Sequence, residues 1–154
     1  MNPLDKNAIL IDLSESDRTD FGRRDFAAQS LPQRVFSSIW ALEAEVNNGG
    51  FSQYCFNTSS DSVAFVVQAL TSIGAPLTAE LCKRAIESGF PNGLPPTPEE
   101  ISLAAAEFDD TIHGELECLD SDFFAYPNDL TTLLFDYVSS HPEEFGEIRE
   151  LYPG

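Results

Sequence analysis

Apolar residues recur at steps of three and four along most of this chain, which is the period of a helix buried on one side. The first run follows Ser30-Leu31-Pro32, where a serine cap precedes a first-turn proline, and it stops at Asn48-Gly49-Gly50. Its apolar positions are Val35, Phe36, Ile39, Trp40, Leu42 and Val46. We predict a helix there, and then a short segment that turns inward Phe51, Tyr54, Cys55 and Phe56.

Two further helices are predicted before residue 90. The first is apolar nearly all round, is capped by Ser60 or Asp61 and ends at Gly74, which is typical of a central buried helix. Its apolar positions are Val63, Phe65, Val66, Val67, Ala69, Leu70 and Ile73. The second follows Pro76 and ends at Gly89, and its amphipathic positions are Leu77, Leu81, Cys82, Ala85 and Ile86.

Four prolines within residues 90–98 predict a stiff, non-helical connector. After it, Thr97-Pro98-Glu99-Glu100 has the pattern of a capping box. One apolar stripe then continues through Ile101, Ala105, Phe108, Ile112, Leu116 and Leu119, so residues 99–122 are treated as one helix that Gly114 could break. Asn128 is expected to cap a last long helix that stops at His141-Pro142 and has as apolar positions Leu130, Leu133, Leu134, Tyr137 and Val138.

No segment alternates like a β-strand for more than a few residues. The predicted fold class is therefore all-α: a single-domain, multi-helix bundle with a proline-rich connector. Residues 31–150 form the helical domain in this prediction. Residues 1–30 are an N-terminal extension whose order the pattern leaves open.

Composition narrows the function. The chain has 154 residues, 42% of them hydrophobic, which is enough for a buried core. Its 8 basic and 26 acidic residues give a net charge of -18, which argues against direct binding of nucleic acid or anionic lipid. The chain starts without a secretion signal, and no apolar run approaches the roughly 18 residues of a membrane span. Three widely spaced cysteines, Cys55, Cys82 and Cys118, fit a cytoplasmic protein, with each expected in the core.

The acidic residues are concentrated in the last third of the chain. Residues 1–98 carry 11 acids and 7 bases, whereas residues 99–154 carry 15 acids and the single base Arg149. Solubility would explain such an excess, and so would an electrostatic copy of nucleic acid. If residues 99–122 were one helix of about 36 Å, its nine acids would be spaced at about 4 Å, against roughly 3.4 Å per phosphate in one DNA strand. The main candidates for partner binding are Glu107, Asp109, Asp110, Glu117, Asp120 and Asp122, with an outer set of Glu143, Glu144 and Glu147.

Residues 45–57, with the core Asn-Gly-Gly-Phe-x-Gln-Tyr-x-x-Asn, resemble the signature of a family of small acidic bacterial proteins known as DNA-mimic proteins. The resemblance covers roughly residues 30–150. It implies an all-helical homodimer that binds and blocks the DNA-binding face of a basic protein, such as a helix-turn-helix transcription regulator. The motif residues are interpreted as structural: the glycines reverse the chain, the aromatic rings pack, and the amides bond the backbone of the turn. They are Asn48, Gly49, Gly50, Phe51, Gln53, Tyr54 and Asn57.

Two other functions remain open at this stage. Asp109, His113 and Glu117 are spaced so that one helix face could hold a divalent metal in an enzyme, although a solvated polar face is the simpler interpretation. The acidity also suits an adaptor or immunity-type protein that binds a basic partner without DNA-binding function. His141 is interpreted as a helix C-terminal cap. No phosphate-binding loop or nucleophile motif is present, so we expect no enzymatic activity, no metal and no cofactor.

Overall fold

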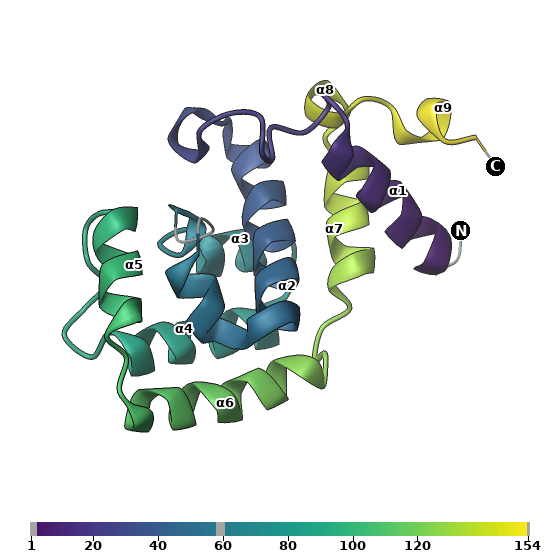
Figure 1. Cartoon of the computed structure of the whole chain (residues 1–154). Helices are drawn as coiled ribbons and strands as arrows, with labels where there is room; N and C mark the ends of the chain where they lie inside the picture. The colour runs from purple at the N-terminus through teal and green to yellow at the C-terminus, as the bar shows by residue number, and fades with distance from the viewer. Residues whose placement is uncertain (1–2, 58–60, 154) are drawn as a thin grey trace.

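The computed structural model describes residues 3–57 and 61–153, and within these ranges the chain forms helices and turns without a β-strand (Figure 1). The all-α prediction is confirmed. The elements in chain order are α1 (Pro3–Glu15), the 3-10 helix η1 (Phe26–Ala28), α2 (Leu31–Phe56), α3 (Val66–Ser72), α4 (Pro76–Gly89), α5 (Pro98–Ala106), α6 (Asp110–Phe124), α7 (Leu130–Ser139), α8 (Pro142–Phe145) and α9 (Ile148–Leu151).

Helix α2 is the centre of the arrangement. It contacts α3, α5, α6 and α7, while α4 packs against α3 and α6, and α1 packs against α7. Figure 1 shows α6 across one end of the molecule and α1, α8 and α9 at the other. The N-terminal helix shares the core, because Ile9, Leu10 and Leu13 are buried in the same apolar cluster as the inner residues of α2 and α7. None of the helices in the described ranges is long and apolar enough to cross a bilayer.

The glycine pair divides α2 into two helical runs that meet at a kink, so the first run stops at Asn48-Gly49-Gly50 as predicted. Ser30 caps the helix by accepting a hydrogen bond from the Gln33 amide, as its pattern predicts. Gly49 and Gly50 leave the helical conformation, and Gly50 has a φ of 76° that favours glycine. The helix then continues to Phe56 in a new direction.

The segment after the bend turns inward only in part. The side chains of Phe51, Tyr54 and Cys55 are buried as predicted. Phe56 is 51% exposed, so its predicted inward position is wrong. It follows Cys55 directly and therefore lies on another side of the helix, where its carbonyl oxygen accepts a hydrogen bond from Ser102 of α5.

Helix α3 is shorter than predicted. It begins at Val66 without a side-chain cap, so Asp61 does not cap it, and Ser60 lies outside the described residues. Residues 61–65 form tight turns instead, and there Ser62 bonds the buried Tyr54 hydroxyl. Gly74 ends the helical run with a φ of 81°, as predicted. The local contact with Tyr54 thus replaces one turn of the predicted helix.

The start of α4 depends on a residue far away in the chain. The Asn128 side chain accepts hydrogen bonds from the amides of Leu77 and Thr78, at 3.0 and 2.9 Å. Asn128 therefore caps α4, and its predicted role as cap of α7 is wrong: Asp129 caps α7 by accepting from Thr132. Leu77 was also assigned wrongly to the apolar face, since it is 56% exposed in the capped first turn.

The stripe after residue 98 runs over two helices instead of one. Thr97 caps α5 as predicted, but α5 ends at Ala106 and Asp109 caps a new helix, α6, by accepting from the Ile112 amide. Phe108 stays on the apolar stripe through the break because its ring packs edge-on against Phe90. Gly114 lies inside α6 and does not break it. The comparison of a 36 Å helix with a DNA strand is therefore wrong, and α6 alone spans about 22 Å.

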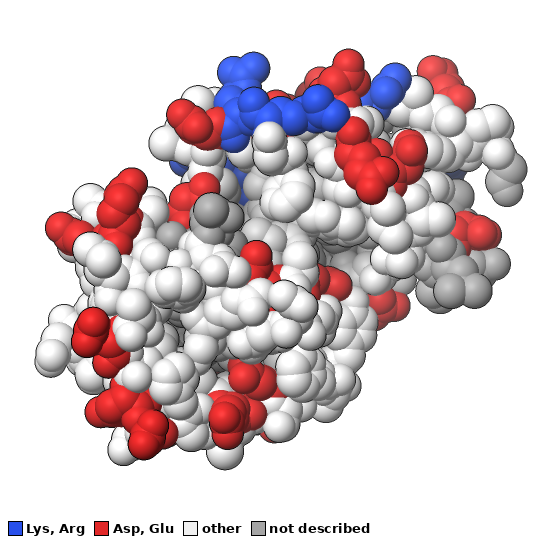
Figure 2. Space-filling model, in the orientation of Figure 1, with Lys and Arg blue, Asp and Glu red and all other residues white. Residues whose placement is uncertain are grey.

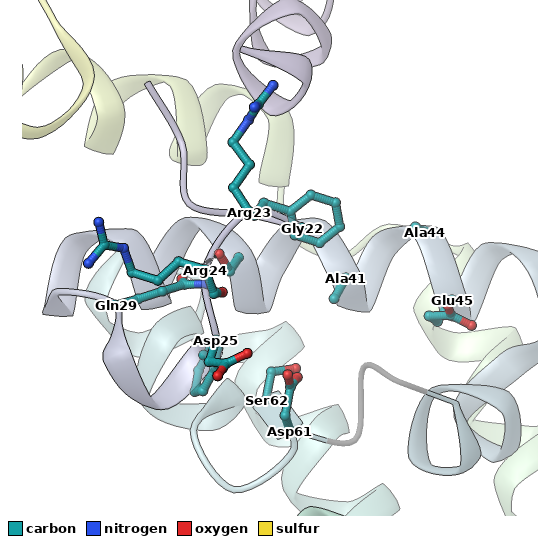
Figure 3. A pocket seen from close by; sticks show the side chains of 13 residues that line it. Gly22, Arg23, Arg24, Asp25, Gln29, Ala41, Ala44, Glu45, Asp61 and Ser62 are labelled. Carbon is teal, nitrogen blue, oxygen red and sulfur yellow. Dashed lines mark hydrogen bonds between the residues drawn. The ribbon is translucent and has the colours of Figure 1, made fainter. Parts of the chain in front are cut away.

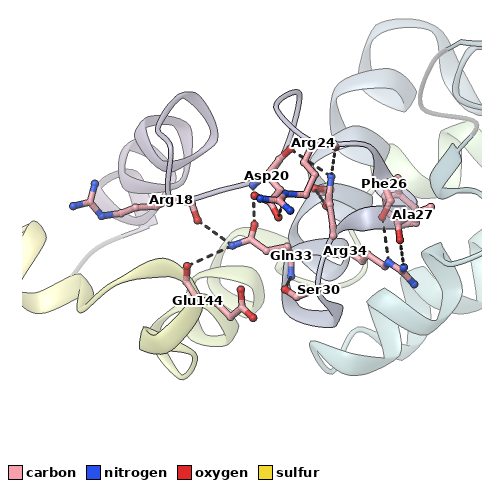
Figure 4. Close-up of polar contacts among 11 residues, drawn as sticks. Arg18, Asp20, Arg24, Phe26, Ala27, Ser30, Gln33, Arg34 and Glu144 are labelled. Carbon is pink, nitrogen blue, oxygen red and sulfur yellow. Dashed lines mark hydrogen bonds and ion pairs between the residues drawn. The ribbon is translucent and has the colours of Figure 1, made fainter.

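The segment that joins α1 to α2 is fastened by buried polar contacts (Figure 4). Gln33, which is 4% exposed, accepts from the Asp20 amide and donates to the carbonyl oxygens of Arg18 and Glu144. One side chain of α2 thereby holds the joining segment and α8 together.

Candidate functional site

The corner formed by the sequence motif is built around one carboxylate. Glu45 Oε2 accepts hydrogen bonds from Gln53 Nε2 at 2.7 Å and from Asn57 Nδ2 at 2.9 Å. The prediction that these amides bond the backbone of the turn is therefore wrong. They bond a side chain one turn before the bend, which braces the two halves of α2 across the glycines. Asn48 is exposed at the bend.

Asp120 joins α6 to this bend. Its Oδ1 accepts a hydrogen bond from the Phe51 amide at 2.8 Å, and the carboxylate lies so close to Gly50 that a Cβ there would collide with it. Burial raises the pKa of the Asp120 carboxyl, while the bond from Phe51 works against that rise. A residue expected to contact a partner is thus engaged inside the fold.

The other carboxylates of α6 form two rows along the helix. At about 3.6 residues per turn, Asp110 and Glu117 share one flank, and Glu115 and Asp122 share the other. All four side chains are exposed. The solvent-facing crest between the rows holds the small, exposed residues Gly114, Cys118, Ser121 and Ala125. Glu115 was not among the predicted site residues, although its seven-residue spacing from Asp122 repeats that of Asp110 and Glu117.

No base forms an ion pair with these rows within residues 3–57 and 61–153, although Arg84 of α4 lines the same surface hollow as Glu115 and Asp109. The ion pairs in that part of the chain join Arg18 to Asp17 and Arg24 to Asp20. On the face in Figure 2, basic side chains lie along the edge that carries the segment between α1 and α2, whereas acidic side chains alone are distributed over α5 and α6. The excess charge of the C-terminal part is therefore left facing solvent.

Arg23 and Arg34, in and beside the joining segment, form hydrogen bonds with backbone carbonyl oxygens and not, within the described residues, with carboxylates. Arg23 donates to the carbonyl oxygens of Ser16 and Glu15, and Arg34 donates to those of Phe26 and Ala27. A cavity of about 420 Å³ beneath the segment is lined by three acids, Asp25, Glu45 and Asp61. Figure 3 shows Arg23 extending away from Asp25 and Asp61. Burial raises the pKa of Asp61, and the nearby Asp25 adds to the rise.

The remaining predicted partner-binding residues fall into two places. Glu107 and Asp109 are exposed in the break between α5 and α6, next to the rows, although the Asp109 carboxylate also caps α6. Glu143 and Glu144 lie on α8 and Glu147 follows it, at the opposite end of the molecule from α6 (Figure 1). The structure therefore groups the main set and separates the outer set from it.

The proposed metal ligands are not brought together. Asp109 caps α6, and His113 Nδ1 lies 3.0 Å from the Ser52 hydroxyl of α2. In the described part of the chain, no three His, Cys, Asp or Glu side chains are placed to share a metal ion. His141 takes the capping position predicted for it, with Nδ1 at 2.7 Å from the Tyr137 carbonyl oxygen.

The cysteines differ in their surroundings. Cys55 and Cys82 are buried as predicted, and burial raises the pKa of the Cys55 thiol to about 12 and that of Cys82 higher still. Cys118 is exposed on the crest of α6, so its predicted place in the core is wrong. It lies on the side of the helix opposite Leu116 and Leu119, which face the core.

Fold and surface together define an acidic all-α protein whose exposed carboxylate rows on α6 form no ion pair within the described residues. Comparison with protein families agrees with this class. A family model described as DMP19-like protein matches residues 27–141, so the chain belongs to that family, which is a family of DNA-mimic proteins. Helix α1 lies outside the matched range. Comparisons with curated proteins and with solved structures returned no match.

Proposed function

We propose that this protein is a DNA mimic that binds the DNA-binding face of a basic protein, such as a helix-turn-helix regulator, and blocks it. The observation that carries the proposal is the pair of carboxylate rows on α6. All four row residues are exposed and none makes an ion pair within the described residues. Membership of the DMP19-like family supports the same function.

The dimensions of α6 suit this role. Residues seven apart in a row are separated by about 10.5 Å along the helix axis, which is close to three phosphate steps of roughly 3.4 Å. The rows lie on opposite flanks of a helix about 10–12 Å wide, and the major groove of DNA is about 12 Å wide. The small residues of the crest keep the surface between the rows low. The cationic side chains of a DNA-binding face, which contact phosphates on both strands, can therefore approach both rows.

The same geometry supports a choice among the acids. Asp110, Glu115, Glu117 and Asp122 form the binding rows in this proposal, with Glu107 and Asp109 at one end of them. Asp120 supports the rows from inside, because its carboxylate is bonded to the Phe51 amide. Glu143, Glu144 and Glu147 lie too far from α6 to share its contact surface (Figure 1).

We infer further that the protein acts as a homodimer, as the family resemblance implies. Two copies would present two α6 helices and so match a longer stretch of duplex than the 22 Å of one helix. Phe124 and Tyr126, 54% and 39% exposed at the end of α6, supply apolar surface for such a contact. Light scattering coupled to size exclusion tests this inference: a mass of one chain at micromolar concentration would contradict it.

The binding test uses an immobilised helix-turn-helix DNA-binding domain and the full chain. We expect saturable binding that duplex DNA displaces and that weakens steeply between about 50 and 200 mM salt. The double substitution Asp110→Asn with Glu117→Gln should weaken binding about 3- to 30-fold, since it removes two charge contacts. Glu115→Gln with Asp122→Asn should act similarly on the other row.

The matched control is Glu143→Gln with Glu147→Gln, which removes the same charge at the far end. If it weakens binding as much as the row variants do, net charge and not the rows drives association, and the proposal is wrong. If the partner recovered from a lysate has no DNA-binding function, the chain is instead an acidic adaptor of the immunity type. Binding that duplex DNA does not displace would also contradict mimicry.

A further inference from the structure

A second cavity lies on the other side of α2, where α1 and α7 meet it. Its volume is about 240 Å³. Leu10 of α1 and Leu130 and Leu134 of α7 form an apolar wall, and all three are buried. The α2 side is formed by Trp40 and Glu43, with Asn47 at the rim. The size suits a molecule of a few carbon atoms and is smaller than most drug-sized sites of roughly 300–1,000 Å³.

Glu43 is the one charged residue among those that line this cavity. Its Oε1 accepts a hydrogen bond from the Tyr126 hydroxyl at 3.3 Å, a long contact for an O–H donor. Burial is the main reason that the pKa of the Glu43 carboxyl is raised to about 7; the hydrogen bond from Tyr126 works against the rise and the nearby Asp129 adds to it. The cavity therefore contains a partly buried carboxylate that has no cationic side chain among the residues around it.

The indole next to Glu43 is held in place. Trp40 stacks on Phe36 with ring centroids 5.5 Å apart and planes 13° apart, and Phe36 is fully buried. An aromatic ring beside a carboxylate in an apolar cavity is a combination that attracts organic cations, through the ring face and the charge together. No lysine, arginine or histidine lines the cavity, so an anion would find no counter-charge there.

Tyr126, which bonds Glu43 from outside the set of residues that line the cavity, has a backbone conformation that is rare for its type. Its φ is 55°, in the left-handed region, and the strain is held by two contacts with Thr131: the Thr131 amide donates to the Tyr126 hydroxyl at 3.2 Å, and the two hydroxyls lie 3.3 Å apart. Strained residues of this kind cluster at sites that clamp ligands.

We propose that this cavity binds a small primary amine: the ammonium group pairs with Glu43, and a short apolar stem lies between Trp40 and the leucine wall. The ammonium supplies the cation that the Glu43 carboxylate lacks, and the stem covers apolar surface of Leu10 and Leu134. Since α1 lies outside the range matched by the family model, the wall formed by Leu10 belongs to the part of this chain beyond that range. The inference is independent of the α6 rows.

The test uses the full chain and the fluorescence of Trp40, which is the only tryptophan of the sequence. The probe is n-pentylammonium chloride at pH 8, with 1-pentanol and sodium pentanoate as neutral and anionic molecules of similar size. We expect a saturable change in emission with the ammonium compound and binding at least about tenfold weaker for the other two. The melting temperature should rise with the ammonium compound alone.

Glu43→Gln is the decisive variant and Glu80→Gln, an exposed acid on α4, is its matched control. Glu43→Gln keeps the shape of the side chain and removes a buried charge, so the variant folds and its melting curve verifies this. We expect it to weaken n-pentylammonium binding at least about tenfold, and Glu80→Gln to leave it unchanged. A response of equal size in both variants, an equal response to 1-pentanol, or no saturable response in the wild type would each overturn the proposal.

Discussion

The segment before α2 and helix α6 both carry dense charge, but they place it differently. In the segment, Arg23 donates to backbone carbonyl oxygens and Arg24 pairs with Asp20, while Gln33 and Arg34 of the adjoining first turn of α2 bond the backbone of the segment. On α6, the two carboxylate rows contact no cation within the described residues. Charge in the first region stabilises the fold, whereas charge in the second slightly opposes it through repulsion. A count of charged residues cannot separate these roles; the partner of each group does.

The same contrast exists on a smaller scale within α6. Asp120 and Asp122 are two residues apart, yet Asp120 accepts a hydrogen bond from Phe51 and Asp122 is exposed on a flank. The Asp120 carboxylate therefore stabilises the fold, as the charged groups of the joining segment do. The Asp122 carboxylate faces solvent, as the other row residues do. Glu43 is a third case, a carboxylate that is half-buried with no cation among the residues that line its cavity.

The largest effect is expected from Gln33→Leu. The change leaves the Asp20 amide and the carbonyl oxygens of Arg18 and Glu144 without their partner in a buried place, at a cost of about 3 kcal/mol in the free energy of unfolding. The melting temperature should fall by roughly 5–10 °C. Gln68→Leu on the exposed side of α3 is the control. Equal losses in both variants would mean that the contacts of Gln33 do not hold the segment.

Glu43→Gln should stabilise the protein at high pH. Since the folded-state pKa of Glu43 is raised to about 7 from 4.5, the folded protein binds a proton more tightly than the unfolded chain, and stability falls as pH rises through this window. At pH 4 the variant and the wild type should unfold alike. At pH 8 the variant should be more stable by on the order of 2 kcal/mol. Urea titrations at the two pH values measure this, and a less stable variant at pH 8 would contradict it.

Asp120→Ala and Asp122→Ala form a matched pair on one helix. Removing Asp120 leaves the Phe51 amide unpaired beside the bend of α2 and should cost about 1–2 kcal/mol in the free energy of unfolding. Removing Asp122 should change it by no more than about 0.5 kcal/mol. Chemical denaturation of both variants gives the comparison. Similar changes in the free energy of unfolding would show that the Asp120 carboxylate contributes no more to stability than the exposed Asp122 carboxylate does.

The smallest effect concerns salt. Because the row carboxylates repel one another, raising sodium chloride from about 20 to 200 mM should stabilise the wild type by a few tenths of a kcal/mol. A variant with all four row residues changed to their amides should respond less. Thermal melts at both concentrations measure the difference. The same salt response in both proteins would show that the row carboxylates are not the source of the repulsion that salt screens.

The helix signals that lie within a few residues were predicted from the sequence. Ser30 with Pro32, Gly74, and Thr97 each act as their local pattern indicates, because a cap or a breaker works through its nearest backbone groups. The break between α5 and α6 was missed for the opposite reason. Phe108 packs on Phe90 in the core, so the apolar residues keep their helical spacing across a break in which the backbone is not helical.

Contacts between distant residues were beyond the reach of the pattern. Asn128 caps α4, about fifty residues earlier in the chain, and Glu45 accepts from both Gln53 and Asn57 across a bend. For the candidate site, the sequence reasoning identified the acidic residues near α6 but not their division into bound and unbound groups. That division depends on which carboxylate faces the Phe51 amide, and only the packing of α6 against α2 determines it.

The crest of α6 has a consequence for how such a protein can change. Gly114, Cys118, Ser121 and Ala125 face solvent, and even a Cβ added at Gly114 would meet no atom within 4 Å. Substitutions along this line by residues that favour a helix therefore meet no packing constraint, and recognition is the main filter on them. Evolution could change the binding partner through single substitutions on the crest. A combinatorial library limited to the crest and its flanks could likewise be used to select binding to new partners without changing the fold.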